Sequence, residues 1–325
     1  MKNQKKKRRL RSILTGILWV LLLQFVLFNI SAALYADKFT HLHFHTMETS
    51  PKPLSANVFA RTWRLFTGPT LYKRDLTENP AFPFTIITLK TKKDIPIKSW
   101  YCKADSVSKG TVILFHGLTG NKGLVLDEAN TFRSLGYNVM LVDMRAHGNS
   151  GGNATTIGFK ESEEVGLAYD YVKQTGQKNI FIWGASMGAV AVIKAVADYQ
   201  LHPSGIIIEM PFLSLQSYLE GQARFLGFPR EPFGFLISFW IGAEQGFNGH
   251  GFKTSRYAKN INCPVLMQYG EKDELVLPNE TNTIYDAITS ADKKLVIYDN
   301  AAHESFLQKD PVTWKKEVTA FLNQY

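Results

Sequence analysis

Six short apolar segments, separated by stretches with helical spacing, constrain the fold of this chain more than any other feature. The apolar segments lie at residues 111–117, 138–144, 179–186, 205–211, 264–270 and 294–300. Continuous apolar strands of this length are typical of a parallel sheet that is buried on both faces. The stretches with helical spacing fall at about 123–135, 159–174, 188–200, 279–290 and 311–323. The alternation predicts an α/β fold with a mostly parallel sheet and helices on both faces.

Two further segments add to this pattern. Residues 84–90 and 96–104 alternate apolar and polar side chains on either side of a short polar turn, which predicts a hairpin of two half-buried strands. Residues 212–260 separate two of the apolar segments and are rich in Phe and Gly. A long excursion inside a compact domain is usually a lid or a binding loop, so we expect a small cap insertion. Additional helices that only extend the core are the alternative.

The N-terminus combines a basic tail with a long apolar run. Seven of the first eleven residues are Lys or Arg, and residues 13–36 carry no charge. About 20 apolar residues cross a bilayer as a helix, and preceding basic residues favour a cytoplasmic N-terminus. We therefore expect a cytoplasmic tail over 1–12, a transmembrane signal anchor over 13–36 and a connector over 37–83. The folded domain of residues 84–325 would lie on the exported side of the membrane.

A cleaved signal peptide is the alternative interpretation of the same run. Ser31-Ala32-Ala33 offers a cleavage site with small residues in the required positions. The apolar core of a signal peptide is normally about 7 to 15 residues long, and this run is longer, which favours an uncleaved anchor. The folded domain is exported under either interpretation.

The net charge of +9 does not indicate a nucleic-acid partner. Seven of the 37 basic residues lie in the N-terminal tail, which leaves 30 basic residues against 28 acidic ones, a net charge of +2. A nucleic-acid-binding domain is expected to carry a basic face on the folded part itself. We therefore expect no nucleic-acid partner.

The sequence Gly184-Ala185-Ser186-Met187-Gly188 lies between a predicted strand and a predicted helix. A serine at this point needs a tight, strained turn to lift its hydroxyl clear, and the flanking glycines remove side chains that would collide there. The context predicts a nucleophile elbow with Ser186 as the nucleophile. A glycine-rich turn that happens to contain serine is the alternative.

A serine hydroxyl is a weak nucleophile and needs a base, and that base needs an orienting carboxylate. In a strand-turn-helix arrangement of this kind the chain order is Ser, then acid, then His. Asp273 and His303 follow the last two predicted strands, at the carboxyl ends where open α/β sheets place their sites. We predict His303 as the general base and Asp273 as its partner. The alternatives are His202 or His250 for the base, and Glu209, Glu271 or Glu274 for the acid.

An acyl-transfer site also needs hydrogen-bond donors for the oxyanion. The backbone N–H of Met187, directly after the nucleophile, is the first candidate. The second is the N–H of Leu118, in the glycine-containing loop that follows the first apolar strand. His116 in the same loop precedes the nucleophile, so we interpret it as a side chain that fixes the loop.

Taken in order, these motifs resemble the α/β-hydrolase superfamily, and most of all its serine-aminopeptidase-like and monoacylglycerol-lipase-like branch. The resemblance covers roughly residues 84–325 and includes the segment Asp143-x-Arg145-x-His147-Gly148-x-Ser150. It implies the α/β-hydrolase fold and a Ser-Asp-His catalytic triad at the three positions predicted above. It further implies that residues 143–150 form a structural loop beside the site. Members of this branch are esterases, lipases, thioesterases or peptidases.

Three functions are compatible with these features. The leading hypothesis is a membrane-anchored serine hydrolase that cleaves small-molecule or lipid esters through an acyl-enzyme, with no metal or cofactor. A peptidase or amidase with the same triad is the second, and Glu209 or Glu244 would then hold the substrate amine. The third is a catalytically silent, membrane-tethered binding domain.

Overall fold

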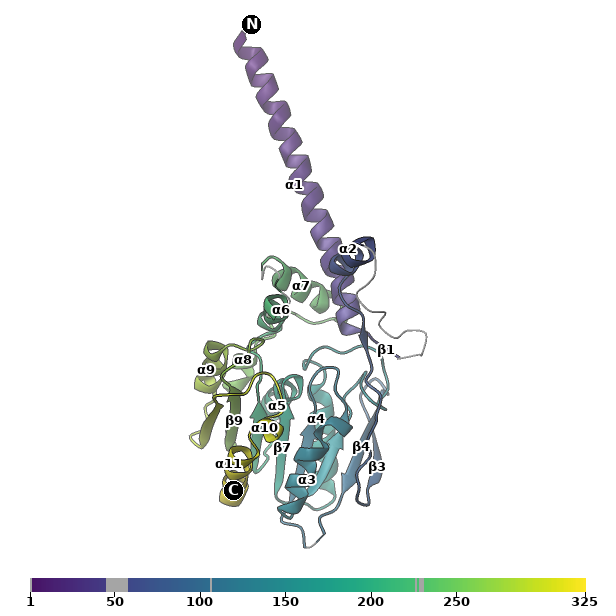
Figure 1. Cartoon of the computed structure of the whole chain (residues 1–325), viewed down its shortest axis with the longest axis vertical. Helices are drawn as coiled ribbons and strands as arrows, with labels where there is room; N and C mark the ends of the chain where they lie inside the picture. The colour runs from purple at the N-terminus through teal and green to yellow at the C-terminus, as the bar shows by residue number, and fades with distance from the viewer. Residues whose placement is uncertain (1, 45–57, 106, 226, 228–230) are drawn as a thin grey trace.

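The computed structural model describes residues 2–44, 58–105, 107–225, 227 and 231–325. Residues 45–57 of the expected connector, and residues 226 and 228–230 of the expected insertion, lie outside this part. Among the described residues, eight strands form one sheet in the order β10-β9-β8-β7-β5-β6-β4-β3. Figure 1 labels β9, β7, β4 and β3 of this sheet. The predicted α/β fold with a mostly parallel sheet is confirmed.

The predicted hairpin forms one edge of this sheet. β3 (Thr85–Lys90) pairs antiparallel with β4 (Pro96–Cys102), which pairs antiparallel with β6. All other neighbours in the sheet are parallel. The remaining strands are β5 (Thr111–Phe115), β6 (Asn138–Val142), β7 (Ile180–Ala185), β8 (Gly205–Glu209), β9 (Val265–Gly270) and β10 (Lys293–Tyr298).

Burial of the strands explains why the sequence contains two different strand patterns. Every residue of β5, β6, β8 and β9 is buried, because helices cover both faces of the central sheet. The edge strand β3 is exposed or half-buried along its whole length. Five of the six continuous apolar segments therefore form central strands, and the alternating pair forms one edge; the sixth apolar segment forms β10 at the other edge, which is only partly buried.

Two hydrophobic clusters separate the helices into layers on opposite faces of the sheet. One cluster takes side chains from α3 (Leu126–Ser134), α10 (Phe306–Lys309) and α11 (Pro311–Gln324). The other takes side chains from α4 (Ser162–Gln174), α5 (Met187–Asp198), α8 (Thr254–Ala258) and α9 (Pro278–Ala287). A short 3-10 helix, η2 (Lys122–Val125), leads into α3.

The N-terminal helix α1 (Lys2–Thr40) projects from the domain (Figure 1). It extends beyond the expected anchor at both ends, because residues 2–40 contain no proline and a single glycine, Gly16. Among the described helices it alone is long and apolar enough to cross a membrane, and its most apolar window is not buried at all. The expected connector contains α2 (Val58–Thr67) and a two-stranded parallel pair, β1 (Leu42–His43) and β2 (Leu71–Tyr72).

The segment expected to be a cap forms α6 (Leu215–Phe225), α7 (Phe233–Gln245) and α8. Helices α6 and α7 lie at the end of the domain from which α1 projects (Figure 1). Part of the segment is core, since Phe212, Ile241 and Phe252 have no exposed surface. These three side chains therefore extend the core of the domain.

The last turns of α1 belong to the folded core, which leads to a test of stability. Phe39 is 4% exposed and packs beside Tyr35 and Tyr218, with ring centroids 5.8 and 6.4 Å away. We expect Phe39→Ala to lower the free energy of unfolding by about 3 to 5 kcal/mol, because it leaves a cavity under α6. Urea denaturation of the detergent-solubilised chain measures this change. Phe28→Ala, on the exposed part of α1, is the control, and equal midpoints for the two variants would contradict the prediction.

Candidate active site

Ser186 lies at the sharp turn between β7 and α5. Its backbone has φ 52° and ψ −115°, a left-handed conformation that is strained for a residue with a side chain. The turn is held by a hydrogen bond from the Ser186 N–H to the Glu209 carbonyl, 2.8 Å long. Ser186 is only 8% exposed.

The glycines on either side of Ser186 are required by close backbone contacts. A Cβ atom at Gly184 would lie 2.7 Å from the Gly188 carbonyl carbon, and one at Gly188 would lie 2.3 Å from the Phe115 carbonyl oxygen. Neither contact can be relieved by rotating a side chain, since both involve backbone atoms. Glycine is therefore required at positions 184 and 188 because the turn at Ser186 packs against the end of β5.

The structure brings the three predicted side chains together from the ends of β7, β9 and β10. His303 Nε2 lies 2.9 Å from Ser186 Oγ, and His303 Nδ1 lies 2.7 Å from Asp273 Oδ2. The other oxygen of Asp273 accepts from the N–H groups of Leu275 and Val276, at 2.8 and 2.9 Å. A Cβ at Gly270 would lie 2.5 Å from the Ala301 carbonyl oxygen, so glycine lets β9 approach the loop that carries His303.

The loop after β5 lies beside the nucleophile. An added Cβ at Gly117 would be 3.5 Å from the Ser186 Cβ. Within the described part of the chain, the backbone N–H groups of Leu118 and Met187 donate to no protein acceptor. Leu118 follows Gly117 and Met187 follows Ser186 in the chain, and unpaired N–H groups can bind a developing negative charge.

Two buried histidines fix this loop. His116 Nε2 accepts from the Met144 N–H at 3.2 Å, and His147 Nε2 accepts from the Thr119 N–H at 3.2 Å. Burial lowers the pKa of His116 to about 4 and that of His147 to about 3, so both rings are neutral acceptors at pH 7. Thr119 needs the support, because its φ of 60° is unfavourable for a β-branched residue.

Residues 143–150 form hydrogen bonds and an ion pair with residues 119–122, in and directly after the same loop. The Asp143 carboxylate forms a buried ion pair with Lys122 and accepts from the backbone N–H groups of Lys122 and Asn149, at 2.7 and 2.8 Å. Asp143 therefore ties the start of η2 to its own loop. These contacts agree with the structural role that the family resemblance implies for the segment.

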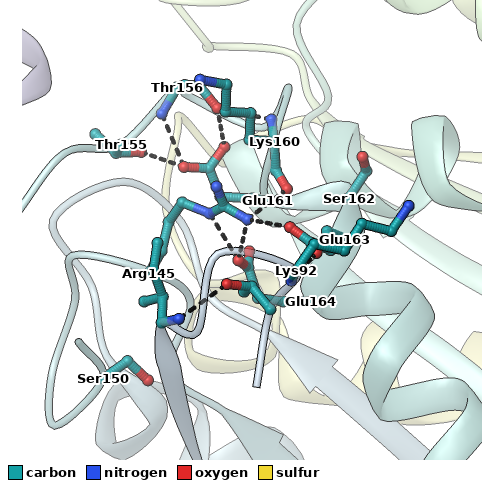
Figure 2. Close-up of polar contacts among 12 residues, drawn as sticks. Lys92, Arg145, Ser150, Thr155, Thr156, Lys160, Glu161, Ser162, Glu163 and Glu164 are labelled. Carbon is teal, nitrogen blue, oxygen red and sulfur yellow. Dashed lines mark hydrogen bonds and ion pairs between the residues drawn. The ribbon is translucent and has the colours of Figure 1, made fainter. Parts of the chain in front are cut away.

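A buried cluster around Arg145, which we did not identify from the sequence, supports the other side of the turn (Figure 2). Arg145 binds the carboxylates of Glu164 and Glu163, with N–O distances of 2.7 and 2.9 Å. Glu161 accepts from the hydroxyls and N–H groups of the preceding loop, including Thr155 Oγ1 at 2.8 Å. Thr155 Oγ1 in turn lies 3.6 Å from the Met187 sulfur. The sequence signal that could have indicated this cluster is the acidic run Glu161-Ser162-Glu163-Glu164, which follows Arg145 by 16 residues.

The alternative base and acid residues lie elsewhere. His202 is exposed at the far end of α5, and His250 stacks on Phe235 with ring centroids 4.2 Å apart. Glu271 and Glu274 are exposed. Glu209 is buried, and one of its oxygens accepts from Trp183, Trp314 and Gln268 at 2.9, 2.7 and 3.1 Å. Of the candidate acids, only Asp273 contacts His303.

The environment of Glu209 makes stability depend on pH. Burial raises its pKa to about 8, so the folded protein binds a proton that the unfolded chain releases near pH 4.5. The stabilisation that this bound proton gives the folded state is fully present below pH 4.5. As the pH rises toward 8 it is lost, and the free energy of unfolding falls by about 1 kcal/mol per pH unit. We expect Glu209→Gln to remove this loss and keep the three accepted hydrogen bonds. Unfolding midpoints at pH 5, 6, 7 and 8 measure the effect, and parallel curves for variant and wild type would contradict it.

Metal-binding side chains are not grouped in the described residues. Across the described ranges, no set of three or more His, Cys, Asp or Glu residues could hold a metal ion. The groups that meet at Ser186 are a hydroxyl, an imidazole, a carboxylate and backbone amides.

A parallel sheet with an elbow serine at the end of β7, and an acid and a histidine after the last two strands, defines an α/β-hydrolase. A family model described as "Serine aminopeptidase, S33" matches residues 106–233 and 247–310. The match covers more than half of the chain, and the chain therefore belongs to this hydrolase family.

Similar proteins include both characterised and uncharacterised relatives. The uncharacterized protein YqkD of Bacillus subtilis is 28% identical over 230 residues, covering 69% of this chain and 74% of YqkD. The lysophosphatidylserine lipase ABHD12 of Danio rerio is 26% identical over 199 residues, covering 58% of this chain and 49% of the lipase. The chain thus matches about half the length of that lipase.

Among solved structures, an esterase of Pyrococcus furiosus, Pf2001, has a similar fold. It aligns with a TM-score of 0.64 and 24% identity, covering 78% of this chain and 99% of the esterase. At this identity the likeness supports the α/β-hydrolase fold.

Proposed function

We propose that this protein is a membrane-anchored serine hydrolase that cleaves carboxylic esters. The observation that carries the proposal is the continuous hydrogen-bonded chain from Ser186 Oγ through the His303 ring to Asp273, with distances of 2.9 and 2.7 Å. A nucleophile, a base and an orienting carboxylate in this order are the arrangement needed for acyl transfer.

In the proposed reaction Ser186 Oγ attacks the acyl carbon while His303 Nε2 takes the hydroxyl proton. The oxygen of the acyl group, now negatively charged, is bound by the N–H groups of Leu118 and Met187. His303 returns the proton to the leaving alcohol, and an acyl-enzyme remains on Ser186. Water, deprotonated by His303, then releases the acid and restores the serine. Asp273 holds the Nδ1–H of His303 throughout.

We propose lipid or acyl esters as the substrate class. Relatives named as lysophosphatidylserine lipases support an ester with an acyl chain and a polar headgroup. The exposed apolar part of α1 and the Phe-rich insertion would bring the site to such molecules. The low exposure of Ser186 supports a covering role for the insertion, which would have to open or present a channel to acyl chains.

The same features support the membrane arrangement predicted from the sequence. We propose a cytoplasmic basic tail over 1–12, a membrane anchor over 13–36 and an exported hydrolase domain over 84–325 joined by the connector 37–83. Retention of the anchor is supported by the burial of Ser31 and Ala32 against the domain, because cleavage after Ala33 would remove both residues. Similarity to a yeast protein named as a membrane protein, YNL320W of Saccharomyces cerevisiae, also supports membrane association.

The two carboxylates considered for the peptidase alternative do not contact the catalytic side chains. Glu209 is buried, and one of its oxygens accepts from Trp183, Gln268 and Trp314. Glu244 lies on α7 near Asp37 and His41 of the α1 end, where burial and Asp37 raise its pKa to about 7. Neither side chain contacts Ser186 or His303, so the geometry favours esters over substrates with a free amine.

A series of nitrophenyl esters with increasing acyl length, assayed beside aminoacyl amides, tests the proposal. We expect hydrolysis of the esters, with kcat/KM rising with chain length as more apolar surface is buried. Cleavage of the amides alone would establish the peptidase. No turnover of either class, together with no labelling by a fluorophosphonate, would favour the silent binding domain.

A further inference from the structure

The folded domain begins to cover α1 at a well-defined point along the helix. The large apolar side chains between Ile13 and Phe28, and Ile30 after them, are at least 43% exposed. Ser31, Ala32 and Ala36 are then 3%, 1% and 0% exposed. Burial of α1 against the domain therefore begins at Ser31.

Helix α7 crosses α1 at this level (Figure 1). Trp240 Nε1 donates to Asn29 Oδ1 at 3.3 Å, and the rings of Phe233 and Tyr35 lie 6.3 Å apart. The Asn29 amide nitrogen is also satisfied, by the Phe25 carbonyl at 2.9 Å. The groove between Trp240 and this part of α1 therefore has polar groups that are already paired and walls that are otherwise apolar.

Helix α2 lies against α1 at the same level. Ser31 Oγ donates to the Phe66 carbonyl at 2.5 Å, and Lys38 Nζ donates to Thr67 Oγ1 at 2.7 Å. These two contacts hold the C-terminal end of α2 beside the first covered turns of α1.

Helices α7 and α2 each expose a pair of aromatic side chains. On α7, Phe235 and Phe239 are each 48% exposed, and on α2, Phe59 and Trp63 are 78% and 54% exposed. Each pair is spaced four residues apart, so its members share one face of their helix. We call these four side chains the aromatic collar. Exposed apolar patches of this kind usually mark an interaction surface.

The length of the anchor places the collar at the edge of the bilayer. A hydrocarbon layer takes about 20 helical residues, so a span that starts after Arg11 ends close to Ser31. Aromatic side chains favour the boundary between hydrocarbon and headgroups, and amphipathic helices lie in that plane. The helices that carry the collar contact α1 at Asn29 and Ser31, which lie close to this boundary.

We propose that the aromatic collar lies in the headgroup–acyl boundary of the bilayer that α1 enters, and that lipid esters approach the site from this boundary. The proposal rests on the membrane anchoring and ester hydrolysis proposed above. The occupant of the collar surface is the lipid bilayer itself, because both helices that carry the collar pack against α1 where its exposed apolar part ends.

Spin labels test the position of the collar. The full chain carries Cys263→Ser, which leaves the buried Cys102 as the other cysteine. Single labels are placed by Trp63→Cys, Phe235→Cys and Phe239→Cys, with Leu18→Cys as the membrane reference and Ile297→Cys as the aqueous reference. Both reference side chains are exposed in the structure, at 66% and 52%. The protein is reconstituted into phosphatidylcholine vesicles, and label collisions with oxygen and with a water-soluble nickel chelate are measured.

We expect the collar labels to collide more with oxygen and less with the nickel chelate than the Ile297→Cys label. If the collar labels behave like the aqueous reference while the Leu18→Cys label is in lipid, the proposed membrane position of the collar is wrong, and the membrane span of α1 still stands. Collar labels shielded from both reagents would also overturn the position of the collar, since a protein partner or a second copy would then cover the surface. A Leu18→Cys label in water would overturn the anchor itself.

A second variant tests the lipid route. We expect Phe235→Ser/Phe239→Ser to lower hydrolysis of a vesicle-embedded nitrophenyl ester several-fold, with hydrolysis of water-soluble nitrophenyl acetate unchanged. Ile297→Ser is the matched control. Equal losses on both substrates, or no loss on either, would contradict an approach of lipid esters along the collar. An inactive wild type would instead contradict the proposed ester hydrolysis.

Discussion

Replacing Ser186 by alanine is expected to lower kcat for nitrophenyl esters by about 10⁴- to 10⁶-fold, because the variant lacks the hydroxyl that is hydrogen-bonded to His303. The acyl-enzyme cannot form, and the residual rate comes from the remaining oxyanion donors acting on water. Loss of covalent labelling by a fluorophosphonate should accompany the loss of turnover. The hydroxyl is small and the turn is set by glycines, so we expect the fold to be retained.

Ser134→Ala is the matched control for this experiment. Ser134 is exposed on α3, and its hydroxyl donates to the Thr131 carbonyl of its own helix. Wild-type rates and labelling are expected for this variant. If Ser186→Ala kept more than about one-hundredth of the wild-type rate, covalent catalysis at this serine would be wrong, since base catalysis alone supplies about 10²- to 10⁴-fold.

Asp273→Asn is expected to lower kcat by about 10⁴-fold while leaving the fold and substrate binding nearly unchanged. One carboxylate oxygen of Asp273 accepts from the N–H groups of Leu275 and Val276. In the variant the amide oxygen should keep these two bonds, which turns the amide NH₂ toward His303 Nδ1. The ring must then accept at Nδ1 and carry its proton on Nε2, so it can no longer take the proton of Ser186.

The comparison with other carboxylates makes this prediction specific. Asp286→Asn, an exposed change on α9, should keep full activity. Steady-state kinetics separate the effects, since an altered His303 tautomer lowers kcat with KM unchanged, whereas a collapsed site also raises KM. Wild-type kcat in Asp273→Asn would show that another group orients His303.

The sequence was sufficient to predict the central sheet and the elbow. Apolar segments without polar interruption are typical of strands between two layers, and the helical stretches between them supply those layers. The glycines at positions 184 and 188 mark Ser186 because backbone atoms lie where their Cβ atoms would be. These are local consequences of residue type, so they can be recognised without knowing which distant segments meet.

The choice of acid depended on the tertiary structure. Asp273 and His303 are 30 residues apart, and His303 and Ser186 are 117 residues apart. From the sequence, Glu209, Glu271 and Glu274 also follow strands, and the direction in which each side chain leaves its strand end decides between them. Glu209 points into the core toward two tryptophans, a contact that no spacing rule predicts.

The Arg145 cluster and the packing of α1 were decided by tertiary structure for the same reason. Charged residues such as Glu161 and Glu164 usually indicate an exposed helix start, and their burial depends on Arg145, which comes from another loop. The sequence alone determined that residues 13–36 are apolar enough to cross a membrane. Only the folded structure showed that α1 enters the domain core at Ser31 and lies beside two helices with exposed aromatic side chains, because these contacts join segments up to 211 residues apart.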